Sequence, residues 1–183
     1  MTSTDKNTQS LSGIITARRN RALDRQGYIN LGLEILFLLL VGLLLFSQVF
    51  MLTQVKGNSM FPALKDGDLV IAFRMQQDYA KRDVIVYTAD GETRIGRIVA
   101  RATDVVTIDE SGNLLVNGTN QTGEIMYPTY AKEGYTYPLQ VPENHVFVLG
   151  DYRTQTEDSR DFGPISMEDV QGKIITIVRR RGL

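Results

Sequence analysis

The sequence contains no cysteine, no tryptophan and a single histidine, His145, among its 183 residues. Without cysteine, the chain has no disulfide, no thiolate metal site and no cysteine nucleophile. One histidine excludes multi-histidine zinc sites, and a serine–histidine triad would depend on His145 alone. The formal net charge of −1 argues against a nucleic-acid partner. We expect neither a metal ion nor any other cofactor.

Charge is also missing from one continuous stretch of the chain. Residues 35–52 read ILFLLLVGLLLFSQVFML and contain no charged side chain. As a helix this run would be about 27 Å long, close to the hydrocarbon thickness of a bilayer. A buried core helix usually keeps a polar stripe, and a cleavable signal peptide has a shorter apolar run with a small-residue cleavage site. We therefore predict an uncleaved transmembrane anchor over residues 33–52, in contact with membrane lipid.

The cations around this anchor are distributed unevenly. Only Lys56 follows the anchor closely, whereas five cations precede it, namely Lys6, Arg18, Arg19, Arg21 and Arg25. The positive-inside rule then predicts a single-pass cell-membrane protein with a cytoplasmic basic arm, residues 1–32, and an extracytoplasmic domain, residues 53–183. Residues 1–10 are polar, and we expect them to bury too little apolar surface to become ordered.

After the anchor, short β-branched runs alternate with turn signals, which indicates a mainly β domain. The loop 109–113 and the pair Asn117-Gly118 are typical of hairpin turns. Residues 121–139 are rich in Gly, Tyr and Pro and are expected to be irregular. About 130 residues suffice for one small barrel-like β core. The predicted strands are residues 68–73, 83–87, 94–100, 105–108, 114–116, 146–149 and 173–178.

Three sequence blocks carry the candidate chemistry. Residues 57–64 read GNSMFPAL, residues 67–70 read GDLV, and residues 150–163 read GDYRTQTEDSRDFG. A serine between glycine and proline is by itself typical of a turn. Together, and behind one N-terminal anchor, the blocks resemble type I signal peptidases of the Gram-positive type. The resemblance implies a membrane-tethered β-barrel domain that cleaves leader peptides, with Ser59 as the nucleophile.

The resemblance also implies a lysine general base, and the sequence lacks it. The family pattern is roughly aromatic-x-K-R-V-I-G-L-P-G-D, whereas residues 94–104 read RIGRIVARATD. Gly96 therefore stands where the lysine belongs. A serine hydroxyl needs a base such as a neutral amine to take its proton, and Arg94 and Arg97 stay protonated. The sequence predicts a site that has lost its base.

Five further positions are implied by the resemblance to support the site. In the family, the residue at position 156 is a serine that hydrogen-bonds the catalytic lysine, and here it is a threonine. The acid and the cation at positions 158 and 160 are expected to form an ion pair that holds the wall of the site. These five positions are Met60, Pro62, Thr156, Asp158 and Arg160.

Three functions remain open on the sequence. The first is a non-catalytic accessory or chaperone factor that binds secreted precursors; resemblance to degenerate streptococcal relatives found in pilus gene clusters favours pilin precursors. The second is an active signal peptidase with a relocated base, Lys81 or His145 being the candidates. The third is a plain interaction module that uses its outer surface. Lys56 and Lys81 are otherwise interpreted as ordinary solvated cations.

Overall fold

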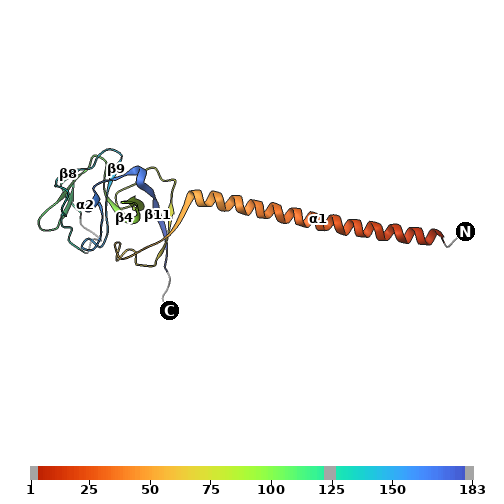
Figure 1. Ribbon diagram of the computed structural model, residues 1–183. Helices are drawn as coiled ribbons and strands as arrows, with labels where there is room; N and C mark the ends of the chain where they lie inside the picture. Colours follow the sequence, from red (N-terminus) through yellow and green to blue (C-terminus); the bar gives the residue numbers. More distant parts are fainter. Residues whose placement is uncertain (1–3, 122–126, 180–183) are drawn as a thin grey trace. The chain divides into compact units, whose positions relative to one another are not determined.

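The computed structural model describes residues 4–121 and 127–179, and the chain divides into two compact units, Met1–Ser47 and Gln48–Leu183. Helix α1 runs from Thr4 to Val49 (Figure 1). The polar arm that we expected to lack order is thus helical from Thr4 onward. Its Thr, Ser, Asn and Asp residues are weak helix formers, so the helix there extends from the turns that follow, because adding a residue to an existing helix is far less costly than starting one.

The C-terminal half of α1 has the properties of a membrane span. Gln26–Val49 has a mean hydropathy of 2.5, none of it is buried, and it is long and apolar enough to cross a bilayer. The helical part of the apolar run ends at Val49, three residues before residue 52, the predicted end of the anchor. The next residues form strand β1, Phe50–Gln54, which pairs with a strand further along the chain. This pairing partner explains the difference, because the anchor sequence by itself gives no sign of it.

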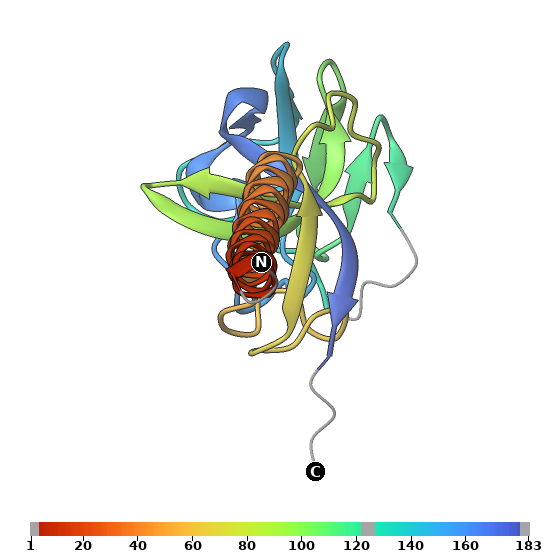
Figure 2. The same ribbon diagram turned by 90° about the vertical axis from the view of Figure 1, so that its right-hand side faces the viewer.

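The second unit contains two antiparallel sheets, so the prediction of a mainly β domain is confirmed. The larger sheet has seven strands in the order β1-β2-β11-β3-β4-β9-β10. Figure 2 shows β11 beside β2, which agrees with the pairing of Val178 with Leu69. The bounds of the strands that follow β1 in this sheet are β2 Leu69–Phe73, β3 Val84–Ala89, β4 Glu92–Arg101, β9 His145–Leu149, β10 Ile165–Ser166 and β11 Val170–Val178.

The smaller sheet has four strands in the order β7-β6-β5-β8. Asn117 and Gly118 have φ angles of 51° and 76°, as a two-residue hairpin turn with left-handed residues requires, and this predicted turn is confirmed. The two-residue strands were not predicted, because so short a segment carries no alternation. The remaining elements are β5 Val105–Ile108, β6 Leu114–Val116, β7 Thr119–Asn120, β8 Leu139–Gln140, α2 Ser159–Phe162 and the 3-10 helix η1 Met167–Asp169.

Three clusters of buried apolar side chains hold the β unit together. One lies between the smaller sheet and β9, and a second packs β3, β4 and β9 around Tyr87, Ile98 and Val148. The third lies under the turn that follows β1 and contains Met60. This third cluster positions the segment that carries Ser59.

Candidate functional site

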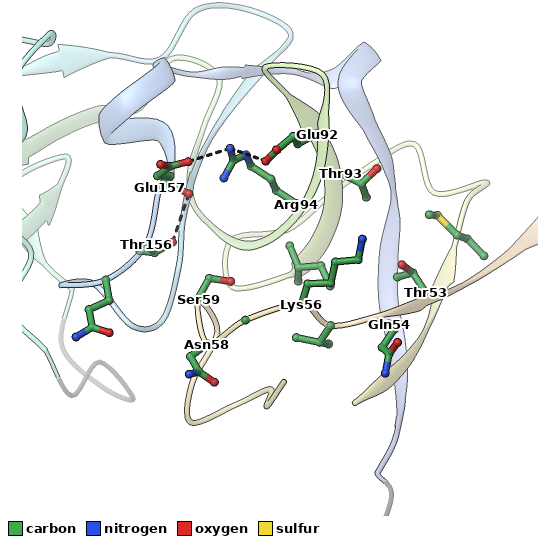
Figure 3. A pocket seen from close by; sticks show the side chains of 15 residues that line it. Thr53, Gln54, Lys56, Asn58, Ser59, Glu92, Thr93, Arg94, Thr156 and Glu157 are labelled. Atoms are coloured by element: carbon green, nitrogen blue, oxygen red, sulfur yellow. Dashed lines mark hydrogen bonds and ion pairs between the residues drawn. The ribbon is translucent and has the colours of Figure 1, made fainter. Parts of the chain in front are cut away.

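A groove of about 780 Å³ opens on the β unit. Three segments that are far apart in the sequence line it: β1 with the turn that follows, the first half of β4, and the middle of the block that begins at Gly150 (Figure 3). In residue numbers these are 51, 53–59, 92–95 and 155–157. The structure therefore brings the serine block and the last block to one site, as the motifs suggested.

Ser59 lies in this groove because its neighbour is anchored in the core. The Met60 side chain is 0 % exposed, and with it buried the adjacent Ser59 faces the opening. Gly57 has a φ angle of 72°, a left-handed conformation that glycine adopts without steric cost, and its N–H donates to Asp66 Oδ1 at 2.7 Å. The residues that bury Met60 are Val55, Leu64 and Val70.

The backbone of Ser59 is joined directly to the last block. The Tyr152 N–H donates to the Ser59 carbonyl at 3.0 Å. A Cβ at Gly150 would lie 2.7 Å from the same carbonyl oxygen and would also collide with Thr156 Oγ1. Only glycine allows the two segments to approach this closely. Ser59 and Thr156 therefore both pack against Gly150.

Asp158 and Arg160 form the expected ion pair, with both side chains almost fully buried. The Arg160 Nε and Nη2 donate to the two Asp158 carboxylate oxygens at 2.9 and 2.8 Å, and the side chains are 2 % and 1 % exposed. Asp158 Oδ2 also accepts the Gly150 N–H at 3.2 Å, and Asp158 caps α2. Neither residue lines the groove. The pair therefore fixes the loop that carries Thr156.

Arg153 is a second buried cation in this loop, and sequence reasoning missed it. Its side chain is 1 % exposed, and it donates to the Gly150 carbonyl at 2.8 Å and to Thr129 Oγ1 at 2.6 Å. Burial lowers the pKa of Arg153 to about 10. The Arg of the GDYR segment was the signal that could have identified it. Arg153 ties the loop to the irregular segment 127–138.

Gly96, where the resemblance of the motifs places the base, is buried in the core and does not line the groove. A Cβ there would lie 2.5 Å from Val148 Cγ1 and 3.2 Å from Tyr87 Cε1. The path that a long side chain would take is thus occupied by valine and tyrosine. Burial, with a further contribution from the Asp158 charge, raises the pKa of Tyr87, so its phenol stays neutral and is a poor proton acceptor.

Lys81 and His145, the candidates for a relocated base, lie outside the groove. Lys81 Nζ forms an ion pair with Asp104 at 3.0 Å, His145 Nδ1 lies 2.8 Å from the Glu143 carbonyl, and neither residue lines the groove. Lys56 does line it, which the sequence did not suggest. Its side chain is exposed, however, and extends away from Ser59 in Figure 3. Among the described side chains, those of residues 26–121 and 127–179, no amine or imidazole is hydrogen-bonded to the Ser59 hydroxyl.

Thr156 lines the groove, and among the described residues its hydroxyl is hydrogen-bonded to no lysine or histidine. Its Oγ1 donates to the Glu157 carbonyl at 3.3 Å, and its own carbonyl accepts from Lys132 Nζ at 2.6 Å. Pro62 lies in the same turn as Ser59 and does not line the groove. Thr156 therefore contributes shape and polarity to the wall.

A charged triad forms one part of the groove wall. Arg94 Nη2 contacts Glu92 at 3.0 Å and Glu157 at 2.9 Å (Figure 3). The Arg94 guanidinium also lies over the Phe162 ring, 5.1 Å from its centroid. The sequence placed Arg94 at the aromatic position of the family pattern but gave no indication that Glu157 would join it.

Comparisons with known proteins show to which family the chain belongs. The family model of signal peptidase, peptidase S26, matches residues 28–179, and the chain belongs to this family. It is 32 % identical over 134 residues to the probable thylakoidal processing peptidase 2 of Arabidopsis thaliana, covering 66 % of this chain and 36 % of that protein. It is 30 % identical over 136 residues to signal peptidase I of Bacillus caldolyticus, covering 66 % and 74 %.

A solved signal peptidase I from Enterococcus faecalis V583 is also similar, with 24 % identity and a TM-score of 0.44, covering 55 % of this chain and 98 % of that one. The chain spans 36 % and 39 % of the lengths of the two Arabidopsis thylakoidal peptidases that it matches.

Proposed function

We propose that this chain is a non-catalytic member of the signal peptidase family that binds the leader segment of secretory precursors. The observation that carries this proposal is the closed position at Gly96, where Val148 and Tyr87 occupy the space of the base. In a serine protease, loss of the base costs on the order of 10⁶ in turnover. The groove around Ser59 is retained, so binding remains possible where proton transfer does not.

The same proposal assigns the two parts of the chain that flank the apolar helix to opposite sides of the membrane. Residues 1–32 are the cytoplasmic arm, and residues 53–183 are the extracytoplasmic domain, because the cations precede the apolar helix. A precursor's leader is itself held in the bilayer, which brings its emerging end to a groove that follows α1 by only a few residues. We propose an accessory or chaperone role in secretion, with pilin precursors favoured by the resemblance of the motifs.

A cleavage and binding assay tests this proposal. The full chain in detergent is mixed with a fluorescent precursor peptide that contains an Ala-x-Ala cleavage site. We expect saturable binding without cleavage, and binding that is abolished by Ser59→Trp, which fills the groove. Cleavage by the native chain that disappears in Ser59→Ala would contradict a non-catalytic role.

A second candidate function is an active peptidase that uses Lys56. The observation in its favour is that Lys56 lines the same groove as Ser59. This function predicts that Ser59→Ala and Lys56→Ala both abolish cleavage. Lys81→Ala and His145→Ala are the matched controls, because both side chains have partners away from the groove.

A further inference from the structure

The groove carries an excess of negative charge at the triad Glu92–Arg94–Glu157. Both carboxylates contact the same nitrogen, Arg94 Nη2, so one cation is shared between two anions. The side chains of Glu92 and Glu157 are 71 % and 65 % exposed, whereas that of Arg94 is 20 % exposed. A ligand that enters the groove therefore meets the carboxylates before it meets the guanidinium.

The two carboxylates are held in place before any ligand arrives. Glu92 comes from β4 and Glu157 from the loop that Asp158 and Arg160 fix from below. Arg94 connects them and is itself held over the Phe162 ring. Preorganised groups lose little conformational freedom on binding, so their charge is available for recognition.

The rest of the groove wall is polar, with one further cation. Among the lining residues, only Met51, Val55 and Ile95 have apolar side chains. Lys56 forms no ion pair among the described residues and extends away from Ser59 in Figure 3. The groove thus presents negative charge at the triad and positive charge at Lys56.

We propose that the groove selects a peptide segment with a lysine or arginine side chain, which binds at the carboxylates of Glu92 and Glu157. This inference rests on the proposed function and adds the chemistry of the ligand to it. The lysine or arginine of the peptide supplies a second cation. It pairs with the second carboxylate, whose charge Arg94 alone does not neutralise. Lys56 repels a basic residue at its own position, so the charges also set the direction in which the segment lies.

The test uses the full chain in detergent and labelled precursor peptides that differ at one scanned position, which is Lys, Gln or Glu. At low salt we expect the best Lys peptide to bind about two- to five-fold more tightly than its Gln counterpart for each carboxylate, the range of an exposed ion pair. The preference should shrink as salt is added. It should disappear in the double variant Glu92→Gln/Glu157→Gln and persist in Glu110→Gln, an exposed acid on the β5–β6 loop.

The peptides themselves make the test independent of whether a variant folds. Equal binding of Lys, Gln and Glu peptides to the native chain, all abolished by Ser59→Trp, would overturn the inference and leave the proposed function standing. A lysine preference that survives in the folded double variant would also overturn it. Failure of every peptide to bind the native chain would overturn both.

Discussion

The backbone of β4 at Gly96 lies against Val148 and Tyr87, at the position where the resemblance of the motifs places the base. A Cβ at this position would be 2.5 Å from Val148 Cγ1, a distance at which something must shift. On the proposed non-catalytic function, the base is more than a deleted side chain, because Val148 and Tyr87 lie where a side chain at position 96 would begin. Restoring a lysine means repacking the second cluster as well.

Gly96→Lys alone is expected to leave cleavage absent and to lower the free energy of unfolding by about 1–3 kcal/mol, the usual cost of overpacking. Urea unfolding of Gly96→Lys, Val148→Ala and the double variant measures the coupling between the two positions. We expect the double variant to be more stable than the sum of the single effects predicts. Thr93→Lys, exposed on the same strand, is the control. Additive effects would show that Val148 does not block position 96.

At the scale of elements, the turn between β4 and β5 joins the two sheets through one carboxylate. Asp104 accepts the Arg101 N–H at 2.7 Å, the Asn117 amide at 2.7 Å and the Lys81 amine at 3.1 Å. Burial acts to raise the pKa of Asp104, but these hydrogen bonds outweigh it, and the pKa lies below its ordinary value. The ionised carboxylate is thus the form that holds the turn.

This depressed pKa predicts a stability contribution that depends on pH. The contribution is complete above the pKa of Asp104 in the unfolded chain and is lost as pH falls through its lower pKa in the folded chain. We expect Asp104→Asn to destabilise the protein most near neutral pH. The difference in unfolding temperature between this variant and the native chain should shrink below about pH 4. Thermal unfolding across pH measures it, with Asp90→Asn as the exposed-turn control. A difference that grows in acid would contradict the assignment.

At the scale of the whole molecule, the two units rely on different surroundings. No residue of the hydropathy window in Gln26–Val49 is buried within the protein, and the segment is long and apolar enough for a bilayer to cover it. The three apolar clusters of the β unit lie entirely after residue 54. The β unit therefore has its own core.

Deleting residues 1–47 is expected to leave a folded β unit that has lost its attachment to the membrane. The measurements are a single cooperative thermal transition by circular dichroism and recovery in the supernatant after alkaline carbonate extraction. The full chain should stay in the pellet until detergent is added. A truncated chain that cannot unfold cooperatively would show that α1 contributes to the core.

Local signals in the sequence determined much of this protein. The apolar run predicted the span, and alternation with turn residues predicted seven of the strands, because both depend on neighbours within a few residues. The motifs predicted that Ser59 and the last block belong to one site, and the Asp158–Arg160 pair followed from them. The absence of a lysine at position 96 was visible in the same way.

Long-range contacts decided the rest. The apolar run turns from helix to strand at Phe50 because β2 pairs with it, and Arg153 is buried because Thr129 reaches it from a distant segment. Arg94 and Glu157 meet only after β4 and the last block have folded together. No local pattern encodes such contacts, since their free energy depends on groups that are far apart in the chain and close together only in the folded protein.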